Sequence, residues 1–308
     1  MAVRLSDCLA KQDTGIIAMR LSDAPLKEEP SLISVRLSDG LGNRLFQLAA
    51  LLGYAERWGK KPTLFPSQIH VCSHADSMKA HRLFPELGYT WDVSGWLSVS
   101  ESAEDYATYK PFPCPDTTSH VRPILLKGFF QTEKYFPMQG IKLSFESVLG
   151  EECMSNLRQH YLHLCRMPHS GSRNATWWIH IRLGDYMTLP HYDIGLSAYL
   201  HAVAPRIPAD ARVILYSDSP GRALELVKEI APCLDVVLAP VLTPIETLYC
   251  MSLASGGCVC TNSSFSWWGA YVSAARSLGA PIYFPGRWNR LPYHCDDVYP
   301  SWGIRVDY

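Results

Sequence analysis

Hydrophobic positions in the second half of the chain alternate between short uninterrupted runs and runs spaced by three and four residues. The uninterrupted runs are typical of buried strands, and the spaced runs are typical of the helices that cover them. From residue 175 onward they predict strands at 175–181, 212–216, 236–238, 257–261 and 281–284, and helices at 197–204, 221–230, 245–254 and 266–278. Strands that alternate with helices at this spacing favour a parallel sheet covered on both faces.

The first half repeats this arrangement in a shorter form. A strand at 31–37, a turn at 39–43, a helix at 44–58 and a strand at 63–65 predict a βαβ start. The polar and aromatic segment 70–120 has no regular pattern, and a strand at 121–130 and a helix at 143–164 follow it. Pro168 and Gly171 then interrupt the pattern, so we place a domain boundary there. Since strands alternate with helices on both sides of this boundary, we expect an α/β fold with two Rossmann-like domains and parallel sheets.

The domains expected from this pattern are an N-terminal extension at 1–33, an N-terminal domain at 34–168 and a C-terminal domain at 169–308. The start of the chain contains a repeat: A-V-R-L-S-D begins at Ala2, A-M-R-L-S-D at Ala18 and S-V-R-L-S-D at Ser34. Each unit is too short to form its own core, which disfavours a solenoid. Only the third copy leads into a glycine turn and a helix, so we expect it to be the native strand.

Composition excludes several classes of protein. The 308 residues are 47% hydrophobic and 19% charged, as in a globular protein and unlike disordered or collagen-like chains. A net charge of −1 and a pI of about 6.8 disfavour a general nucleic-acid or membrane-surface binder. An anionic ligand must therefore meet a local cluster of donors and cations.

The sequence shows no recognisable targeting signal, and the spacing of its cysteines favours a reducing compartment. Charged residues interrupt the first 24 positions, and no apolar run is long enough for a membrane-spanning helix. We expect a cytoplasmic location; a Golgi membrane location would need an anchor outside this chain. The ten cysteines include no C-x-x-C pair, and Cys258 and Cys260 are expected to be buried thiols rather than metal ligands.

The first candidate site segment is the glycine turn Asp39-Gly40-Leu41-Gly42-Asn43-Arg44-Leu45, between a strand and a helix. A glycine turn that opens a helix can bring backbone amides to a phosphate, or it can simply be a tight turn. Asn43 would either cap the helix or reach into a cleft. A dinucleotide fingerprint is disfavoured, since Leu45 stands where its third glycine belongs and no acidic residue follows the second strand.

The second segment ends a strand with His180, Arg182 and Asp185. Alternation sends His180 and Arg182 to the same side of the sheet. The guanidinium fork of Arg182 suits paired phosphate oxygens, whereas the alternative is an Arg182–Asp185 pair that holds a loop. His180 would be either a base or a structural, hydrogen-bonded histidine.

The third segment is polar and enters a helix directly after a strand. Its hydroxyls and free amides would favour an anion at the positive end of the helix dipole, or would form an ordinary N-cap. Trp267 and Trp268, which follow, are expected in the core. The segment comprises Thr261, Asn262, Ser263, Ser264, Phe265 and Ser266.

Together these segments resemble the successive motifs of the GDP-fucose-dependent α-1,2-fucosyltransferases (glycosyltransferase family 11). The motifs are G-L-G-N-R-L-F-Q at 40–47, F-F-Q-T-E-K-Y-F at 129–136, H-I-R-L-G-D-Y at 180–186, Y-S-D-S at 216–219 and T-N-S-S-F-S-W-W-G-A at 261–270. The resemblance implies a GT-B arrangement of two facing domains, the first on the acceptor side and the second on the GDP-fucose side. It also implies transfer of L-fucose from GDP-β-L-fucose with inversion, without an obligatory metal or other cofactor. The acceptor would be an oligosaccharide or glycoconjugate, in this family the 2-OH of a terminal galactose.

The resemblance also assigns roles to residues. Arg182 matches the arginine that holds the donor's β-phosphate, Asn43 matches the asparagine of the glycine turn, and Asp218 is a candidate for nucleoside recognition. The chain departs from the family where Leu183 replaces a second basic residue and Arg44 replaces a glutamine. An Arg44 cation would compensate for Leu183 if the two positions met. The expected donor-binding residues are Gly40, Gly42, Asn43, Arg182, Asp218, Asn262, Ser263, Ser264, Phe265 and Ser266.

Fucosyl transfer requires positive charge at the departing GDP and a base for the acceptor hydroxyl. We expect Arg182, Asp185 and His180 to be catalytic; the candidate bases are Asp185, Glu133, His180 and His191, and the sequence does not choose among them. Two other functions stay open. A catalytically silent nucleotide-sugar- or glycan-binding module is motivated by Leu183 and by the N-terminal repeat, and a nicotinamide oxidoreductase rests only on Gly40-x-Gly42.

Overall fold

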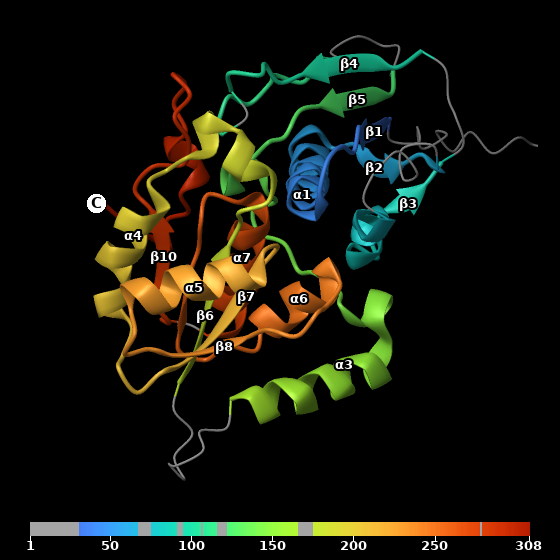
Figure 1. Cartoon of the computed structure of the whole chain (residues 1–308). Coiled ribbons are helices and arrows are strands. Elements are labelled where there is room, and N and C mark those ends of the chain that lie inside the picture. Colours follow the sequence, from blue (N-terminus) through green and yellow to red (C-terminus); the bar gives the residue numbers. More distant parts are fainter. Residues whose placement is uncertain are drawn as a thin grey trace, which may run out of the picture.

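The computed structural model describes residues 31–66, 75–90, 95–105, 107–115, 122–165, 175–277 and 279–308. Within these residues the chain forms two parallel sheets (Figure 1). The first has five strands in the order β3-β2-β1-β5-β4, and the second has six in the order β11-β10-β9-β6-β7-β8. The expected α/β fold with parallel sheets is therefore confirmed.

The N-terminal sheet is built around β1, which pairs with β2 on one side and β5 on the other. Helix α1 leads from β1 to β2 and packs on this sheet. The elements are β1 (Leu32–Val35), α1 (Leu41–Trp58), β2 (Lys61–Leu64), the 3₁₀ segment η1 (Ala75–Leu83), β3 (Gly88–Tyr89), β4 (Leu97–Ser100), β5 (Ile124–Lys127), η2 (Glu133–Tyr135) and α3 (Glu146–Leu164).

The C-terminal sheet has β6 and β9 near its centre. Its strands are β6 (Thr176–Ile181), β7 (Arg212–Ser217), β8 (Asp235–Leu238), β9 (Gly257–Val259), β10 (Ile282–Pro285) and β11 (Ile304–Val306). Its helices are α4 (Leu196–Val203), α5 (Pro220–Ile230), α6 (Pro244–Met251) and α7 (Ser264–Arg276). Short 3₁₀ segments are η3 (Asp185–Thr188), η4 (Pro190–Tyr192), η5 (Ala204–Arg206) and η6 (Asp296–Val298).

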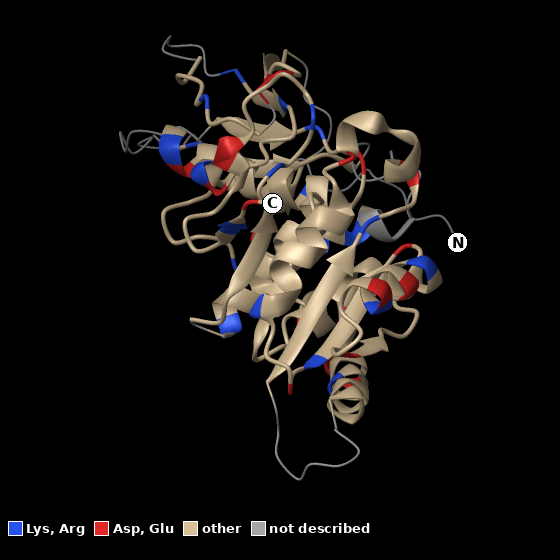
Figure 2. Ribbon diagram, turned by 60° about the vertical axis from the view of Figure 1, so that its left-hand side comes forward, with Lys and Arg blue, Asp and Glu red and all other residues tan. Residues whose placement is uncertain are grey.

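Alternate residues of β6 pack in two apolar clusters, one on each face of the sheet. Trp177, Ile179 and Ile181 pack in the cluster that includes residues of α4 and α5. Trp178 packs in the other cluster, with residues of α6 and α7. Both faces of the sheet are thus covered, and Figure 2 shows the strands almost free of charged residues, which lie mainly on helices and loops. A sheet buried on both faces needs the near-continuous apolar runs seen in the sequence.

The two halves share one apolar core. Phe46 of α1 packs against Trp267 and Trp268 of α7, with ring centroids 4.6 and 5.3 Å apart. Both tryptophans are fully buried, as expected for core residues. A hydrogen bond also joins the two halves: Glu133 Oε2 accepts it from Trp302 Nε1 at 2.8 Å. The relative position of the two halves is therefore fixed by packing, and the space between them is preformed.

The prediction of an irregular segment at 70–120 is wrong in part, because η1, β3 and β4 lie within it. β3 and β4 are edge strands with partly exposed side chains, so they lack the apolar run that marks a buried strand. The third repeat copy does supply β1, through Ser34 and Val35. The first two copies and the domain boundary near residue 168 lie outside the described residues.

Three further observations concern membrane spans, thiols and metal ligands. Within the part of the chain that the structure describes, no helix is both long and apolar enough to cross a membrane. Cys258 and Cys260 are fully buried, as expected for core thiols. Over the same described ranges, no cluster of His, Cys, Asp and Glu side chains is arranged to hold a metal ion.

Candidate active site

A cleft of about 980 Å³ lies where the carboxyl ends of strands from both sheets meet. This volume is at the upper end of the range for small-molecule sites. Every donor-binding or catalytic residue expected from the sequence lines it, with the exception of Ser266. The structure thus brings together segments that are as far apart in the chain as Gly40 and Phe265.

Two helices point their N-termini into this cleft. Gly40 precedes α1 without a side-chain cap, and Ser263 caps α7 by accepting a hydrogen bond from the Phe265 amide at 3.2 Å. Neither helix has an acidic residue in its first turn. The positive ends of both helix dipoles therefore add at one place, which favours a bound anion.

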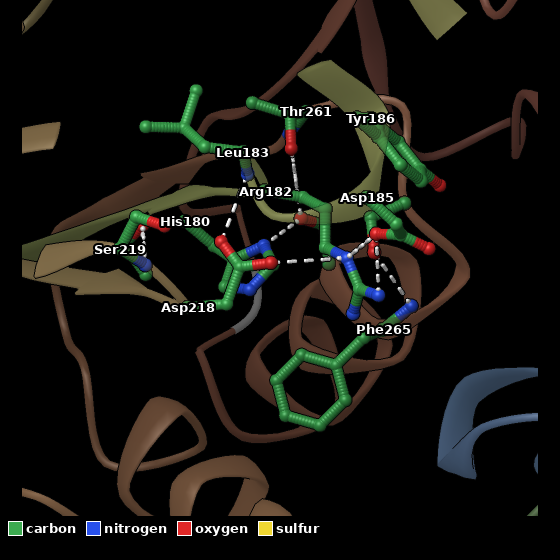
Figure 3. Close-up of polar contacts among 12 residues, drawn as sticks. His180, Arg182, Leu183, Asp185, Tyr186, Asp218, Ser219, Thr261 and Phe265 are labelled. Carbon is green, nitrogen blue, oxygen red and sulfur yellow. Dashed lines mark hydrogen bonds and ion pairs between the residues drawn. The ribbon is translucent and has the colours of Figure 1, made fainter. Parts of the chain in front are cut away.

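Arg182 supplies a full positive charge beside these helix ends. Its Nη2 and Nε atoms donate to Asp185 Oδ1 at 2.8 and 3.0 Å, and its Nε lies 3.2 Å from Asp218 Oδ2 (Figure 3). The guanidinium lies over the ring of Tyr186, 5.6 Å from its centroid. The Arg182–Asp185 pair thus exists, and it orients the guanidinium while leaving the side chain in the lining of the cleft.

Asp218 holds the turn that follows β6. Its second oxygen, Oδ1, accepts a hydrogen bond from the Leu183 amide at 2.8 Å. The carboxylate therefore bridges the backbone of residue 183 and the guanidinium of Arg182. This contact fixes the position of Arg182 at the end of the strand.

His180 is buried below Arg182. Its Nδ1 atom is hydrogen-bonded to Ser266 Oγ, which also approaches Thr261 (Figure 3). Burial lowers the pKa of His180 to about 4, against the opposing influence of Asp218. A ring that is neutral and weakly basic at neutral pH favours the structural, hydrogen-bonded role over that of a base.

Ser266 is a correction to the expected donor-binding set. Its side chain is fully buried beneath the cleft and does not line it. The reason is helical geometry: residues 263–265 line the cleft at the N-cap and the start of α7, whereas residue 266 turns toward the core. Ser266 supports His180 instead.

The extra cation expected at Arg44 does not compensate for Leu183. Arg44 is fully buried, its Nε donates to the Asp39 carbonyl at 3.0 Å, and it does not line the cleft. Leu183 is also buried, in the apolar cluster that contains Ile181 and Tyr199. Position 183 faces the core here, so its leucine is a packing residue.

Glu133 and His191, two of the candidate bases, are not among the residues that line the cleft. Glu133 instead accepts hydrogen bonds from Trp302 Nε1 and from the Ser301 amide, at 2.8 and 3.1 Å. It therefore connects the two halves of the molecule. Asp39 begins the glycine-turn segment but is not among the expected site residues, and it lines the cleft from the N-terminal half.

Gln131 is a second cleft residue that the motif comparison does not assign. Its Nε2 donates to Asn43 Oδ1 at 2.8 Å, so Asn43 reaches into the cleft and does not cap α1. Gln131 follows Phe130, whose φ of 52° is rare for a bulky residue. Glu101 Oε2 accepts hydrogen bonds from the Phe129 and Phe130 amides, at 2.7 and 3.0 Å, and so holds this loop in place.

An aromatic wall completes the C-terminal side of the cleft. The rings of Tyr186 and Tyr192 are stacked with centroids 4.3 Å apart. Tyr186 donates its hydroxyl to the Asn262 carbonyl at 3.2 Å, and Asn262 Nδ2 donates to the Tyr192 carbonyl at 3.1 Å. These bonds tie the loop after β6 to the start of α7. Farther along, the loop after β8 adds an apolar stretch made of Ala239, Pro240, Val241 and Leu242.

Comparison with known proteins gives similar structures only. No family model and no curated protein matches the chain. The fucosyltransferase NodZ from Bradyrhizobium is 16% identical, covers 79% of this chain and 92% of its own, and has a TM-score of 0.46. An Arabidopsis thaliana FUT1 mutant in complex with GDP is 12% identical, with 83% and 70% coverage and a TM-score of 0.46. POFUT1 in complex with GDP is 11% identical, with 83% and 98% coverage and a TM-score of 0.44. Likenesses of this size do not identify a reaction or a substrate.

Proposed function

We propose that this protein is an inverting glycosyltransferase that moves L-fucose from GDP-β-L-fucose to a hydroxyl of a glycan acceptor. The observation that carries the proposal is the convergence of Arg182 with the N-termini of α1 and α7 in one cleft. A guanidinium fork together with the backbone amides of two helix N-termini suits the oxygens of a diphosphate. The fucosyl donor follows from the motif resemblance in the sequence.

The electrostatics of the cleft suit departure of GDP. As the bond between fucose and phosphate breaks, negative charge grows on the phosphate oxygen and positive charge grows on the sugar. Arg182 and the two helix ends stabilise the negative charge on the phosphate oxygen. The carboxylate of Asp185 is hydrogen-bonded to Arg182. Because Asp185 and Asp218 hold Arg182 before donor arrives, little reorganisation is needed when the charge develops.

The two halves divide the substrates. The apolar stretch after β8 and the residues after β7 would receive the nucleoside, with the diphosphate at Gly40, Gly42, Asn43 and at Asn262 to Phe265. We assign Asp218 to positioning Arg182, since both of its oxygens are engaged at that turn. The acceptor enters from the N-terminal half, and the 2-OH of a terminal galactose is the acceptor group that the motifs favour.

Ligand-dependent stability tests the donor class. A thermal-shift series compares GDP and GDP-fucose with GDP-mannose, UDP-galactose and NAD, because a ligand that binds only the native state raises its stability. We expect GDP and GDP-fucose to raise the melting temperature, and UDP-galactose and NAD to leave it unchanged. A rise in melting temperature with NAD alone would contradict the proposal and would favour the interpretation as a nicotinamide oxidoreductase.

Turnover tests the reaction. Release of GDP from GDP-fucose in the presence of lactose or N-acetyllactosamine is expected, and the linkage of the product can be read by NMR. Binding of GDP-fucose without turnover on any galactoside would favour the silent nucleotide-sugar-binding module.

A further inference from the structure

Gln131 is a buried amide at the cleft to which the proposed donor contacts give no role. Its side chain is 7% exposed, and it lines the cleft from the N-terminal half. Its Nε2 atom donates a hydrogen bond to Asn43 Oδ1 at 2.8 Å. A buried amide is costly unless its polar groups find partners. The bond to Asn43 therefore accounts for one end of the Gln131 amide and joins two distant segments at the edge of the cleft.

The loop that carries Gln131 is held at several points. Glu101 Oε2 accepts hydrogen bonds from the Phe129 and Phe130 amides, at 2.7 and 3.0 Å. The Phe130 side chain is fully buried. The Thr132 amide donates to the Phe130 carbonyl at 2.7 Å, which closes a tight turn around Gln131. The position of Gln131 is thus set by its own loop, and Asn43 is not needed to set it.

Helix α1 contacts this loop through two side chains on one face. Asn43 and Gln47 are four residues apart, so they lie one turn apart on the same face of α1. Gln47 Nε2 donates to the Gly128 carbonyl at 3.0 Å, and Asn43 receives the bond from Gln131. These two contacts fix the loop against the first turns of α1.

The bond from Gln131 decides which way the Asn43 amide faces. A carboxamide has one accepting end and one donating end. Because Oδ1 of Asn43 is bonded to Gln131, the Nδ2 group is the end left for the cleft, and no residue that the structure describes accepts a hydrogen bond from it. Its N–H groups therefore lie near the start of α1, where the diphosphate is proposed to bind. The opposite orientation would turn an oxygen toward that anion.

We propose that Gln131 is a positioning residue that holds Asn43 with its Nδ2 group toward the diphosphate of the donor. This assignment rests on the proposed function. A hydrogen-bond donor that is oriented before the substrate arrives stabilises the charge on departing GDP without reorganisation. The phosphates of free GDP are also negatively charged, so the same orientation favours GDP binding. Loss of the Gln131 donor should therefore weaken both GDP binding and transfer.

Near-isosteric substitutions test the assignment. Gln131→Met keeps the size of the side chain but donates no hydrogen bond, and Gln131→Glu, when ionised, can only accept one. Each should raise the Kd for GDP about 10-fold or more, as for loss of a hydrogen bond to a charged group. Gln131→Ala gives the same readout if the methionine variant does not fold. Gln159→Glu, at an exposed glutamine of α3 outside the cleft lining, is the matched control and should bind GDP as the wild type does.

The result for Gln131→Met is decisive. If this variant binds GDP within about two-fold of the wild type in a calorimetric titration, the assignment is overturned. A defect of Gln131→Glu alone would then be explained by repulsion between its carboxylate and the phosphates. The folded state of each variant is checked by its thermal unfolding without ligand.

The pH dependence of Gln131→Glu is a readout that a merely structural role would not move. When protonated, the introduced carboxyl carries an O–H group that can donate to Asn43 Oδ1, as the native amide does. Burial raises the pKa of a carboxyl at this position, so its GDP affinity relative to wild type should recover as the pH falls from about 8 to about 5. The other ionisable groups of the cleft are the same in both proteins and cancel in this ratio. A deficit that stays constant over this range would overturn the assignment.

A double-mutant cycle separates action through Asn43 from direct contact with the donor. Asn43→Ala removes the group that Gln131 positions, so adding Gln131→Met to it should weaken GDP binding further by less than about two-fold. Additive losses would overturn the assignment, because Gln131 would then act on the donor by itself. Failure of the wild-type protein to bind GDP would instead overturn the proposed function, and the assignment with it.

Discussion

Gly42 in the first turn of α1 lies directly against the backbone of Phe265 in the first turn of α7. A Cβ atom on Gly42 would come within 2.5 Å of the Phe265 nitrogen and 2.7 Å of Ser264 Oγ. This contact joins the two halves of the molecule at the point where both helix dipoles are positive. The glycine turn is therefore an interface between the halves as well as a candidate phosphate site.

Replacement of Gly42 by alanine should separate the two helix ends. We expect Gly42→Ala to lower the free energy of unfolding by about 1–3 kcal/mol, because the contact is with backbone that cannot move aside. The stabilisation by GDP should also decrease. Gly40→Ala is the matched control, since a Cβ at Gly40 would meet nothing within 4 Å. Denaturant unfolding of both variants measures the difference, and equal stabilities would contradict the close approach.

Replacement of Arg182 should abolish the affinity for the diphosphate. We expect Arg182→Ala to lower transfer by about 100-fold or more and to remove the GDP-dependent thermal shift. Arg182→Lys keeps the charge but loses the fork that bonds Asp185 and Asp218, so it should recover only part of the activity. Arg290→Ala removes an arginine that is paired with Asp193 outside the cleft lining, and it should leave both readouts unchanged. Full activity of the alanine variant would contradict the role of Arg182.

Introduction of a basic residue at position 183 should not strengthen the donor site. Leu183 is buried among apolar side chains, so Leu183→Arg should lower stability by roughly 3 kcal/mol through burial of a charge. Leu183→Met conserves volume and should cost about 1 kcal/mol or less. Thermal unfolding and GDP titration of the two variants are the measurements. A stable arginine variant with tighter GDP binding would show that the position reaches the phosphate.

Glu101 should make stability fall with rising pH. Burial raises its pKa from 4.5 to about 7, against the opposing effect of the Phe130 and Phe129 amides. The folded protein then binds the proton more tightly than the unfolded chain, so the stabilisation is complete below 4.5 and is lost as the pH rises through 7. Glu101→Gln removes this dependence. We expect its stability relative to wild type to rise by roughly 2 kcal/mol between about pH 5 and about pH 8. If the free energies of unfolding of the two proteins changed with pH in the same way, the shifted pKa of Glu101 would be contradicted.

The buried part of the fold could be read from the sequence. The strands at the centre of each sheet are apolar runs because both of their faces are covered, and the helices between them show a spacing of three and four. Those local patterns also placed Arg182 and the start of α7 at one edge of the sheet. The short strands β3, β4 and β11 lie at or next to the sheet edges with exposed side chains, and no local pattern marks them.

Long-range contacts account for what the sequence did not predict. Gln131 meets Asn43, and Glu101 holds the loop that brings it there, but each pair is separated by many residues and leaves no periodic signal. The left-handed φ of Asp39 and the Tyr186–Tyr192 stack involve residues that are close in sequence, but no periodic pattern marks them either.

The neighbouring residues Arg182 and Leu183 show the difference between what the local sequence predicts and what tertiary packing decides. The sequence by itself determined that a strand ends here and delivers an arginine beside a hydrophobic residue. Only the tertiary structure decided that Arg182 lines the cleft, held by Asp185 and Asp218, and that Leu183 packs in the core. The reason is that apolar periodicity is a local property of the chain, whereas the surroundings of a side chain depend on which distant segments pack against it.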